Sequence, residues 1–353
     1  MNTKTKYASN SVCFNRSIAV ASFALMLLMP DFTKANDGVL DVDNEFPAVG
    51  TILEVATRDG RLRFVGGYCS GSLITPKIFL TAGHCQFFDT RALLEVPGFE
   101  VEYWVSFDNI VTDNDFRCYL HDINHPNADD VGCNPGAVNG ASFHKGTISI
   151  VHPDYTRVIR RRGGPEEIIE TGMRGKVVDL AVVLLETPIN GISPLATASL
   201  ESFNHTDIGL PLTNVGYGWN YHKSIPANPD QPGWGGPTVF EGDFGLRRIA
   251  DIGTLRTVRG QEMVPTQQSS LGEGSVCYGD SGSPLFFRET GGNVNQTVSG
   301  VLTGAALWCM GAEDPFARVD TLEAVGFLNC IKAASTVEEA CECGIEEELG
   351  LCS

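Results

Sequence analysis

Residues 67–85 read GYCSGSLITPKIFLTAGHC. The run 79–81 is short and apolar and leads into a Gly-containing turn, which is typical of a β-strand rather than a helix. His84 lies in that turn, which Cys69 and Cys85 bracket. The stretch therefore predicts a β protein that presents an imidazole where a strand ends.

Similar short apolar runs recur along the rest of the chain. They lie at 48–56, 101–105, 147–151, 177–185, 212–216 and 298–302. The 39 Gly and 18 Pro among 353 residues supply turns between them, which favours an all-β barrel or sandwich. Helical spacing of apolar residues appears only late, at Leu322, Val325, Phe327, Leu328 and Ile331.

Two further strings carry groups that complement an imidazole. Asp179 begins the apolar segment DLAVVL, and Ser281 lies in the Gly-flanked turn GDSGSP at 279–284. A serine hydroxyl is a weak nucleophile that needs a neighbouring base, and the base needs a third group to fix its tautomer. The flanking glycines allow a tight turn that directs amide N–H groups at a developing oxyanion.

The order His84, Asp179, Ser281 and the block 67–85 resemble the trypsin/chymotrypsin-like serine peptidase family. The resemblance covers roughly residues 46–334. It implies two antiparallel six-stranded β-barrels, the first at about 46–195 and the second at about 196–320. A terminal helix at about 321–334 and an acidic, Cys-rich tail at 335–353 would complete the chain.

The resemblance also implies a role for each residue. His84 would be general base and then acid, Asp179 would orient it, and Ser281 would attack a peptide carbonyl to form an acyl-enzyme. The backbone N–H groups of Gly279 and Ser281 would form the oxyanion hole. Taken singly, these residues also fit core filling, a cap and an ordinary turn. We expect protein or peptide substrates, proteinaceous inhibitors, and no metal or other cofactor.

Two other classes of protein compete with this interpretation. A catalytically silent binding module could share the fold, although all three triad residues are present. An esterase-like hydrolase would instead place its nucleophile in a Gly-x-Ser-x-Gly turn, which Ser281 does not occupy.

The family alignment leaves the side-chain preference open. It places Ser275 at the base of the specificity pocket and Thr303, Gly304 and Ala305 along its wall. Asp314 falls at a second lining position. Asp314 would attract a Lys or Arg side chain of the substrate, or it is a solvated loop residue beside a pocket for medium apolar side chains.

The first 35 residues predict a signal peptide. Lys4, Lys6 and Arg16 precede a 12-residue apolar run at 18–29, which is short for a membrane span, and Ala35 fits a cleavage site. An uncleaved anchor is the alternative. Cleavage leaves ten cysteines and changes the net charge from -18 to -21.

Signal cleavage, the negative charge and the even number of remaining cysteines together predict an acidic, disulfide-bonded, exported chain. Nucleic acid is excluded as the main partner by the negative charge, and no other segment is long and apolar enough to cross a membrane. We expect a secreted or periplasmic monomer that does not associate with a membrane after cleavage.

The cysteines support the resemblance. It implies Cys69–Cys85, worth roughly 3 kcal/mol by loop closure, and Cys277–Cys309. Cys118 and Cys133 lie in one insertion and are expected to pair. Three connectivities remain open for the last four cysteines, which are Cys330, Cys341, Cys343 and Cys352.

Two departures from the family pattern stand out. Residues 107–145 are long and rich in Asn, Asp, Pro and Gly, which predicts a loop. His121 and His125 there have the spacing of metal ligands, with Asp122 and 129–130 nearby, although we expect no metal. Asp280, the acidic neighbour of Ser281, lacks the usual activation sequence upstream, so its charge partner is undecided.

Overall fold

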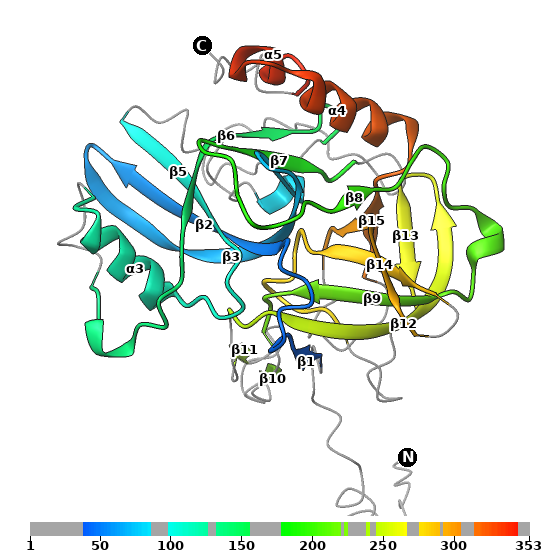
Figure 1. The fold of residues 1–353 in the computed structure, drawn as a ribbon, viewed down its shortest axis with the longest axis horizontal. Helices are drawn as coiled ribbons and strands as arrows, with labels where there is room; N and C mark the ends of the chain where they lie inside the picture. Colours follow the sequence, from blue (N-terminus) through cyan, green and yellow to red (C-terminus); the bar gives the residue numbers. More distant parts are fainter. Residues whose placement is uncertain are drawn as a thin grey trace, which may run out of the picture. The chain divides into compact units, whose positions relative to one another are not determined.

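Six antiparallel strands close the first barrel in the order β2-β3-β4-β7-β6-β5 (Figure 1). Their bounds are β2 Val49–Arg58, β3 Arg61–Thr75, β4 Ile78–Thr81, β5 Phe99–Ser106, β6 His144–Val151 and β7 Ala181–Leu185. The computed structural model describes residues 38–85, 98–125, 132–155, 178–219, 222–224, 238–240, 245–266, 275–289, 292–304 and 314–344. All of these belong to one of the chain's two units, Thr33–Ser353.

The second barrel runs β12-β13-β16-β15-β14-β9 and closes through the pairing of β9 with β12. Its strands are β9 Pro211–Gly216, β12 Arg248–Arg259, β13 Glu262–Pro265, β14 Pro284–Arg288, β15 Val294–Leu302 and β16 Phe316–Arg318. Strand β8, Ala196–Thr197, adds to β15 in parallel, and β10, His222–Ser224, pairs with β11, Thr238–Phe240. The prediction of an all-β, chymotrypsin-like fold with two six-stranded barrels is confirmed.

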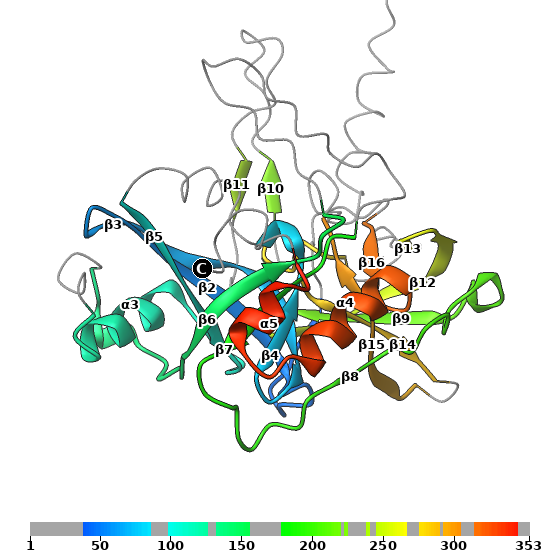
Figure 2. The ribbon, with the colours of Figure 1, turned by 90° about the horizontal axis from the view of Figure 1, so that it is seen from above.

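The predicted terminal helix is also present, as α4, Leu322–Ala333. The Thr321 side chain caps its first turn, and its apolar face buries Phe327, Leu328 and Ile331. Phe327 contacts His152 edge-on at a centroid distance of 5.0 Å, so α4 packs back onto the first barrel just after β6. Figure 2 shows α4 and the short α5, Val337–Cys341, lying beside β6.

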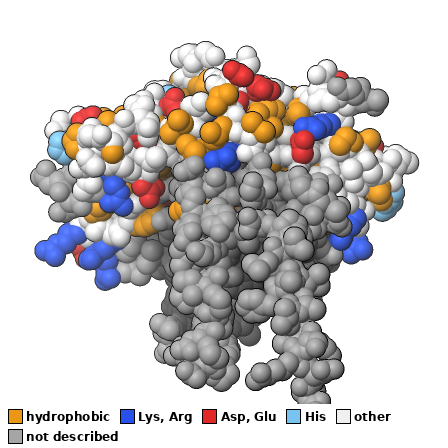
Figure 3. Space-filling view, turned by 90° about the horizontal axis from the view of Figure 1, so that it is seen from below, with side chains coloured by type: hydrophobic (Ala, Val, Ile, Leu, Met, Phe, Trp, Pro, Cys, Tyr) orange, Lys and Arg blue, Asp and Glu red, His pale blue; other side chains and the backbone are white. Residues whose placement is uncertain are grey.

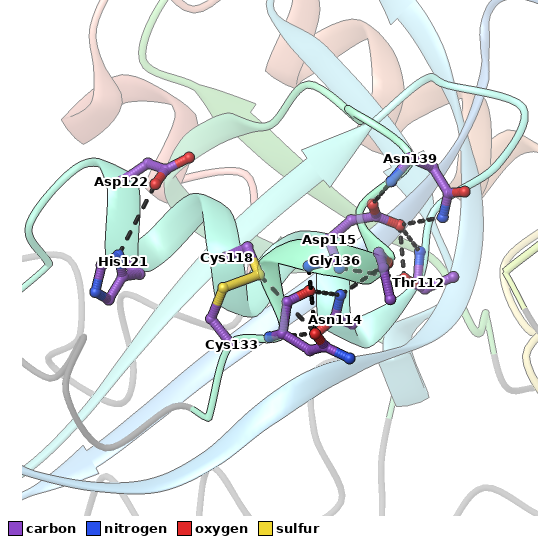
Figure 4. The surroundings of a disulfide bond; sticks show 11 residues. Thr112, Asn114, Asp115, Cys118, His121, Asp122, Cys133, Gly136 and Asn139 are labelled. Carbon is purple, nitrogen blue, oxygen red and sulfur yellow. Dashed lines mark hydrogen bonds and ion pairs between the residues drawn. A yellow bond between two sulfur atoms is a disulfide. The ribbon is translucent and has the colours of Figure 1, made fainter.

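The prediction that residues 107–145 form a loop is wrong in its central part. Residues Asp113–Asp122 form α3, whose N-terminus has a capping box between Thr112 and Asp115. Phe116 and Leu120, one helical turn apart, are fully buried. The Cys118–Cys133 disulfide ties the helix to the segment that follows it (Figure 4). Capping, an apolar stripe and a disulfide together stabilise a helix that composition alone conceals.

The two histidines of this insertion do not converge on one site. His121 is exposed and lies 3.8 Å from Asp122, at the end of α3 shown in Figure 4. His125 instead contacts Glu102 of β5 at 3.1 Å, and Lys145 contacts the other carboxylate oxygen of Glu102 at 3.2 Å. Burial opposes ionisation of Glu102, but these hydrogen bonds outweigh it and lower the pKa of its carboxyl group. Residues 129–130 lie outside the described part of the chain.

The chain enters the second barrel through β1, Val39–Leu40, which pairs with β12. Figure 3 views the molecule from the side where β1 lies in Figure 1, and hydrophobic side chains gather on that face. Val39, Leu40 and Val42 are exposed on this segment. The backbone pairing of β1 with β12 and the buried ion pair of Asp41 with Arg247 hold this segment, not burial of these apolar side chains.

Among the described residues, no helix has the length and apolar character needed to span a membrane. The predicted signal peptide at 1–35 falls outside the described residues.

Candidate active site

His84 and Asp179 are brought together by the pairing of two strands. Thr81 at the end of β4 pairs with Ala181 at the start of β7, so the residues just beyond these two positions lie at the same barrel end. His84 sits in the 3₁₀ turn Gly83–Cys85, and the Cys69–Cys85 disulfide fixes that turn. Asp179 lies two residues before Ala181. The sequence-predicted pair is thus adjacent because an antiparallel ladder places it so.

The Asp179 carboxylate contacts His84 twice. Its Oδ2 lies 2.7 Å from His84 Nδ1, and its Oδ1 accepts a hydrogen bond of 2.9 Å from the His84 backbone N–H. The side chains are only 16% and 9% exposed, so water competes weakly for these bonds. A carboxylate facing Nδ1 keeps a proton there and leaves Nε2 with a lone pair, as a general base requires.

The Tyr155 ring and the Asp179 carboxylate both lie close to Gly83. A Cβ atom added to Gly83 would lie 2.9 Å from Tyr155 Cγ and 3.0 Å from Asp179 Oδ1, so only glycine fits there. The Tyr155 N–H donates to the His152 carbonyl, and His152 Nδ1 accepts from the Asp154 N–H. Burial lowers the pKa of His152, which keeps this ring neutral and able to accept.

The turn that carries Ser281 lies against the strand end that precedes His84. Gly282 has φ of +83°, and a Cβ atom there would lie 2.2 Å from Thr81 Oγ1 and 2.3 Å from the Ser70 carbonyl oxygen. Gly279 also has a positive φ, of 98°. Ser281 itself is half-buried. Glycine at both positions lets the nucleophile turn bend tightly and approach the first barrel closely.

Asp280 is fully buried beside Ser281. Its carboxylate accepts hydrogen bonds from the backbone N–H groups of Cys277, at 2.9 Å, and Gly218, at 2.8 Å. Backbone amides that point at a carboxylate favour its charged form. These two amides stabilise the buried carboxylate as dipoles, but they carry no net charge and are not the charge partner that the sequence left undecided.

The predicted specificity residues are partly described. Ser275 and Asp314 are both fully buried, so the alternative that Asp314 is a solvated loop residue is wrong. The N–H and hydroxyl of Thr303 donate to the Pro315 carbonyl at 3.0 and 2.9 Å, which places Thr303 beside the segment that carries Asp314. A Cβ atom on Gly304 would contact nothing within 4 Å. Ala305 lies outside the described residues.

The disulfides largely follow the predictions. Cys69–Cys85 and Cys118–Cys133 are present. Cys277 is disulfide-bonded, but Cys309 lies outside the described residues, so that pairing stays a prediction. Of the three open connectivities at the end of the chain, the structure selects the one with Cys330–Cys343. Cys341 is also disulfide-bonded, whereas Cys352 is not described.

Sequence reasoning missed two buried residues, one beside this site and one farther along the fold. Ser70 hydrogen-bonds to the nucleophile turn, and Arg247 pairs with Asp41 in the segment that leads from β1 into the first barrel. Ser70 lies inside the stretch 67–85, but the prediction there concerned its neighbour Cys69, and no role was predicted for Ser70. Neither contact has a local sequence signal, because each joins residues about 200 positions apart.

Comparisons with known proteins add little to this geometry. No protein-family model matches the chain, and no curated protein matches it. Among solved structures, human heparin binding protein is similar at 14% identity and a TM-score of 0.48, over 85% of this chain and 98% of that one. A mutant of the same human protein is similar at 15% identity and a TM-score of 0.47, over 85% and 95%. The topology of the two barrels, rather than these likenesses, defines the class of fold.

Proposed function

We propose that the protein is a serine endopeptidase that uses His84, Asp179 and Ser281 as a catalytic triad. The observation that carries the proposal is the double contact of the Asp179 carboxylate with His84, at 2.7 and 2.9 Å. An orienting carboxylate is what a catalytic imidazole needs, and the Gly-flanked Ser281 turn packs against the same barrel end. The disulfides support an exported location, secreted or periplasmic.

The reaction follows from these groups. Ser281 Oγ attacks the carbonyl carbon of the peptide bond while its proton passes to His84 Nε2. The resulting oxyanion accepts hydrogen bonds from the N–H groups of Gly279 and Ser281, and Asp179 stabilises the imidazolium. His84 then gives its proton to the leaving amine as the C–N bond breaks, leaving an acyl-enzyme. Water, deprotonated by His84, attacks the ester carbonyl, and His84 returns that proton to Ser281 Oγ as the C–O bond breaks and the acid leaves.

The burial of Asp314 supports a preference for basic side chains in the substrate. A buried carboxylate at a pocket wall attracts a cation more strongly than a solvated one, because water screens it less. Four reporter peptides that differ only in the residue before the cleaved bond, which is Arg, Lys, Phe or Leu, test this preference. We expect kcat/KM for Arg and Lys to exceed that for Leu by about ten-fold or more.

An Asp314→Asn variant is expected to remove most of that preference while still cleaving the Leu peptide. Cleavage of the Phe and Leu peptides without any cleavage of Arg or Lys would contradict the role of Asp314 and leave the peptidase proposal intact. No cleavage of any peptide, by protein that is correctly folded, would favour the silent binding module.

A further inference from the structure

Ser70 is a fully buried residue of β3 that has no part in the proposed triad. Its hydroxyl donates a hydrogen bond of 2.8 Å to the Gly279 carbonyl oxygen. The same hydroxyl accepts a bond of 3.0 Å from the Tyr217 backbone N–H, just after β9. One side chain of the first barrel therefore holds two backbone groups of the second.

The backbone of Ser70 extends this connection. Its N–H donates to the Ser281 carbonyl at 2.7 Å, and its carbonyl accepts from Thr81 Oγ1 at 2.8 Å. Two carbonyls of the nucleophile turn, those of Gly279 and Ser281, are thus fixed by the same residue. Thr81 lies at the end of β4, three residues before His84. Ser70 connects the strand end before the imidazole to the turn with the nucleophile.

A hydrogen bond that restrains the backbone of Gly279 matters because glycine has no side chain to limit its own backbone conformation. Its φ of 98° is one of many conformations open to a residue without a Cβ atom. Because each peptide unit is planar, a hydrogen bond to the Gly279 carbonyl fixes the unit it shares with Asp280, and with it the backbone from Gly279 toward Ser281. The N–H groups proposed for the oxyanion hole belong to Gly279 and Ser281, on either side of that unit.

We infer that Ser70 is a positioning residue whose hydroxyl holds the oxyanion-hole turn in its reactive orientation. The inference rests on the proposed function, since it assigns Ser70 a task in that reaction. The hydrogen bonds that Ser70 makes between the two barrels, which we call the clamp, are a separate physical claim that can be measured without catalysis.

Replacing Ser70 by Ala deprives two buried groups, the Gly279 carbonyl and the Tyr217 N–H, of a partner. Buried backbone groups rarely stay unpaired, so the turn is expected to shift toward other donors. A shift of the oxyanion donors weakens only interactions made in the transition state. We therefore expect kcat to fall about ten-fold with KM changed less than about two-fold.

Thr51→Val is the matched control. Thr51 pairs with Ser70 across β2 and β3, is also buried, and donates a hydrogen bond from its hydroxyl to the Cys69 carbonyl at 2.9 Å. The substitution removes a buried bond to the peptide unit that joins Cys69 and Ser70, but it keeps the Ser70 hydroxyl and its bonds to the Gly279 carbonyl and the Tyr217 N–H. It therefore separates the loss of the Ser70 hydroxyl from the loss of a neighbouring bond in the same barrel.

The experiment compares full-length wild type, Ser70→Ala and Thr51→Val. Active sites are titrated with a fluorophosphonate, kcat and KM are measured on a reporter peptide, and amide hydrogen exchange is followed over residues 276–283 by mass spectrometry. We expect the kcat loss and about ten-fold faster exchange at 276–283 in Ser70→Ala only. Equal kcat and equal exchange in the two variants would overturn the inference.

An inert wild type would contradict the proposed function, and the exchange rates would still decide the clamp: faster exchange in Ser70→Ala supports it, and unchanged exchange overturns it. If Ser70→Ala does not fold, Ser70→Cys keeps a weaker donor at the same position. It is expected to show a smaller kcat loss than ten-fold, and a kcat equal to that of Thr51→Val would overturn the inference.

Discussion

Replacing Asp179 by Asn is expected to lower kcat about 10⁴-fold with the fold unchanged. An amide is nearly isosteric with the carboxylate, but its NH₂ group can donate to His84 Nδ1 and force the proton onto Nε2. Nε2 then has no lone pair with which to take the Ser281 proton. Loss of the negative charge also leaves the imidazolium without its stabilising partner, which lies 2.7 Å away in the native protein.

The measurement is kcat on a reporter peptide, with thermal unfolding as the check on folding. Asp154→Asn is the control, since Asp154 is an exposed carboxylate near the same barrel end and is bonded to His152 only through its backbone N–H. The control is expected to stay within about two-fold of wild type. An Asp179→Asn variant with near-native kcat would show that Asp179 does not orient a catalytic base.

Replacing Arg247 by Met is expected to destabilise the protein by about 3–5 kcal/mol, because it leaves a buried charge unpaired. Arg247 and Asp41 are both completely buried, and Arg247 Nε lies 2.7 Å from Asp41 Oδ2. The guanidinium also donates to the carbonyls of Val49, at 3.1 Å, and Phe107, at 2.9 Å, and to the Asn44 side chain.

These bonds fix the segment that follows β1. Asp41 itself accepts from the backbone N–H groups of Glu45 and Phe46, at 2.6 and 3.1 Å, so the loss of Arg247 disturbs the whole entry to the first barrel. The Tyr217 hydroxyl, 3.3 Å from Arg247 Nη1, belongs to the same network, and burial raises the pKa of Tyr217. The hydroxyl therefore stays neutral and can donate its single hydrogen to the Asp108 carbonyl, at 2.7 Å, with the Val49 carbonyl farther away at 3.2 Å.

Denaturant unfolding measures the effect. The double variant Asp41→Asn/Arg247→Met is expected to be more stable than Arg247→Met alone, because it removes the orphaned charge. Arg58→Met is the surface control: Arg58 is 48% exposed, lies 3.8 Å from Asp59, and should cost less than about 1 kcal/mol. An Arg247→Met variant as stable as Arg58→Met would contradict this account of the entry segment.

Local patterns predicted the fold well. Three features could be recognised from adjacent residues alone. They are the strand runs separated by turns, the position of His84 between two cysteines, and Asp179 at the head of an apolar strand. The helix α4 was predicted for the same reason, from spacing that places Phe327, Leu328 and Ile331 on one face. Each of these features depends on residues that are close in the chain.

The features that were missed depend on tertiary contacts or on weak local signals. Thr112 and Asp115 do mark a helix start, and Phe116 and Leu120 are one turn apart, but the surrounding Asn, Asp and Gly residues outweighed them. Ser70 and Arg247 bond to groups far along the chain, so no pattern identifies them. The Cys330–Cys343 pairing required the fold of α4 and α5, because three pairings fit the sequence equally well.

The central claim is that Ser281 is a nucleophile activated by His84, and covalent labelling with a fluorophosphonate tests it most directly. The reagent forms a stable phosphonyl ester only with a serine whose proton an adjacent base removes. The account predicts one label per chain, located at Ser281 by peptide mass mapping, and none in Ser281→Ala. Folded wild type that takes up no label at neutral pH, or a label that persists in Ser281→Ala, would contradict it.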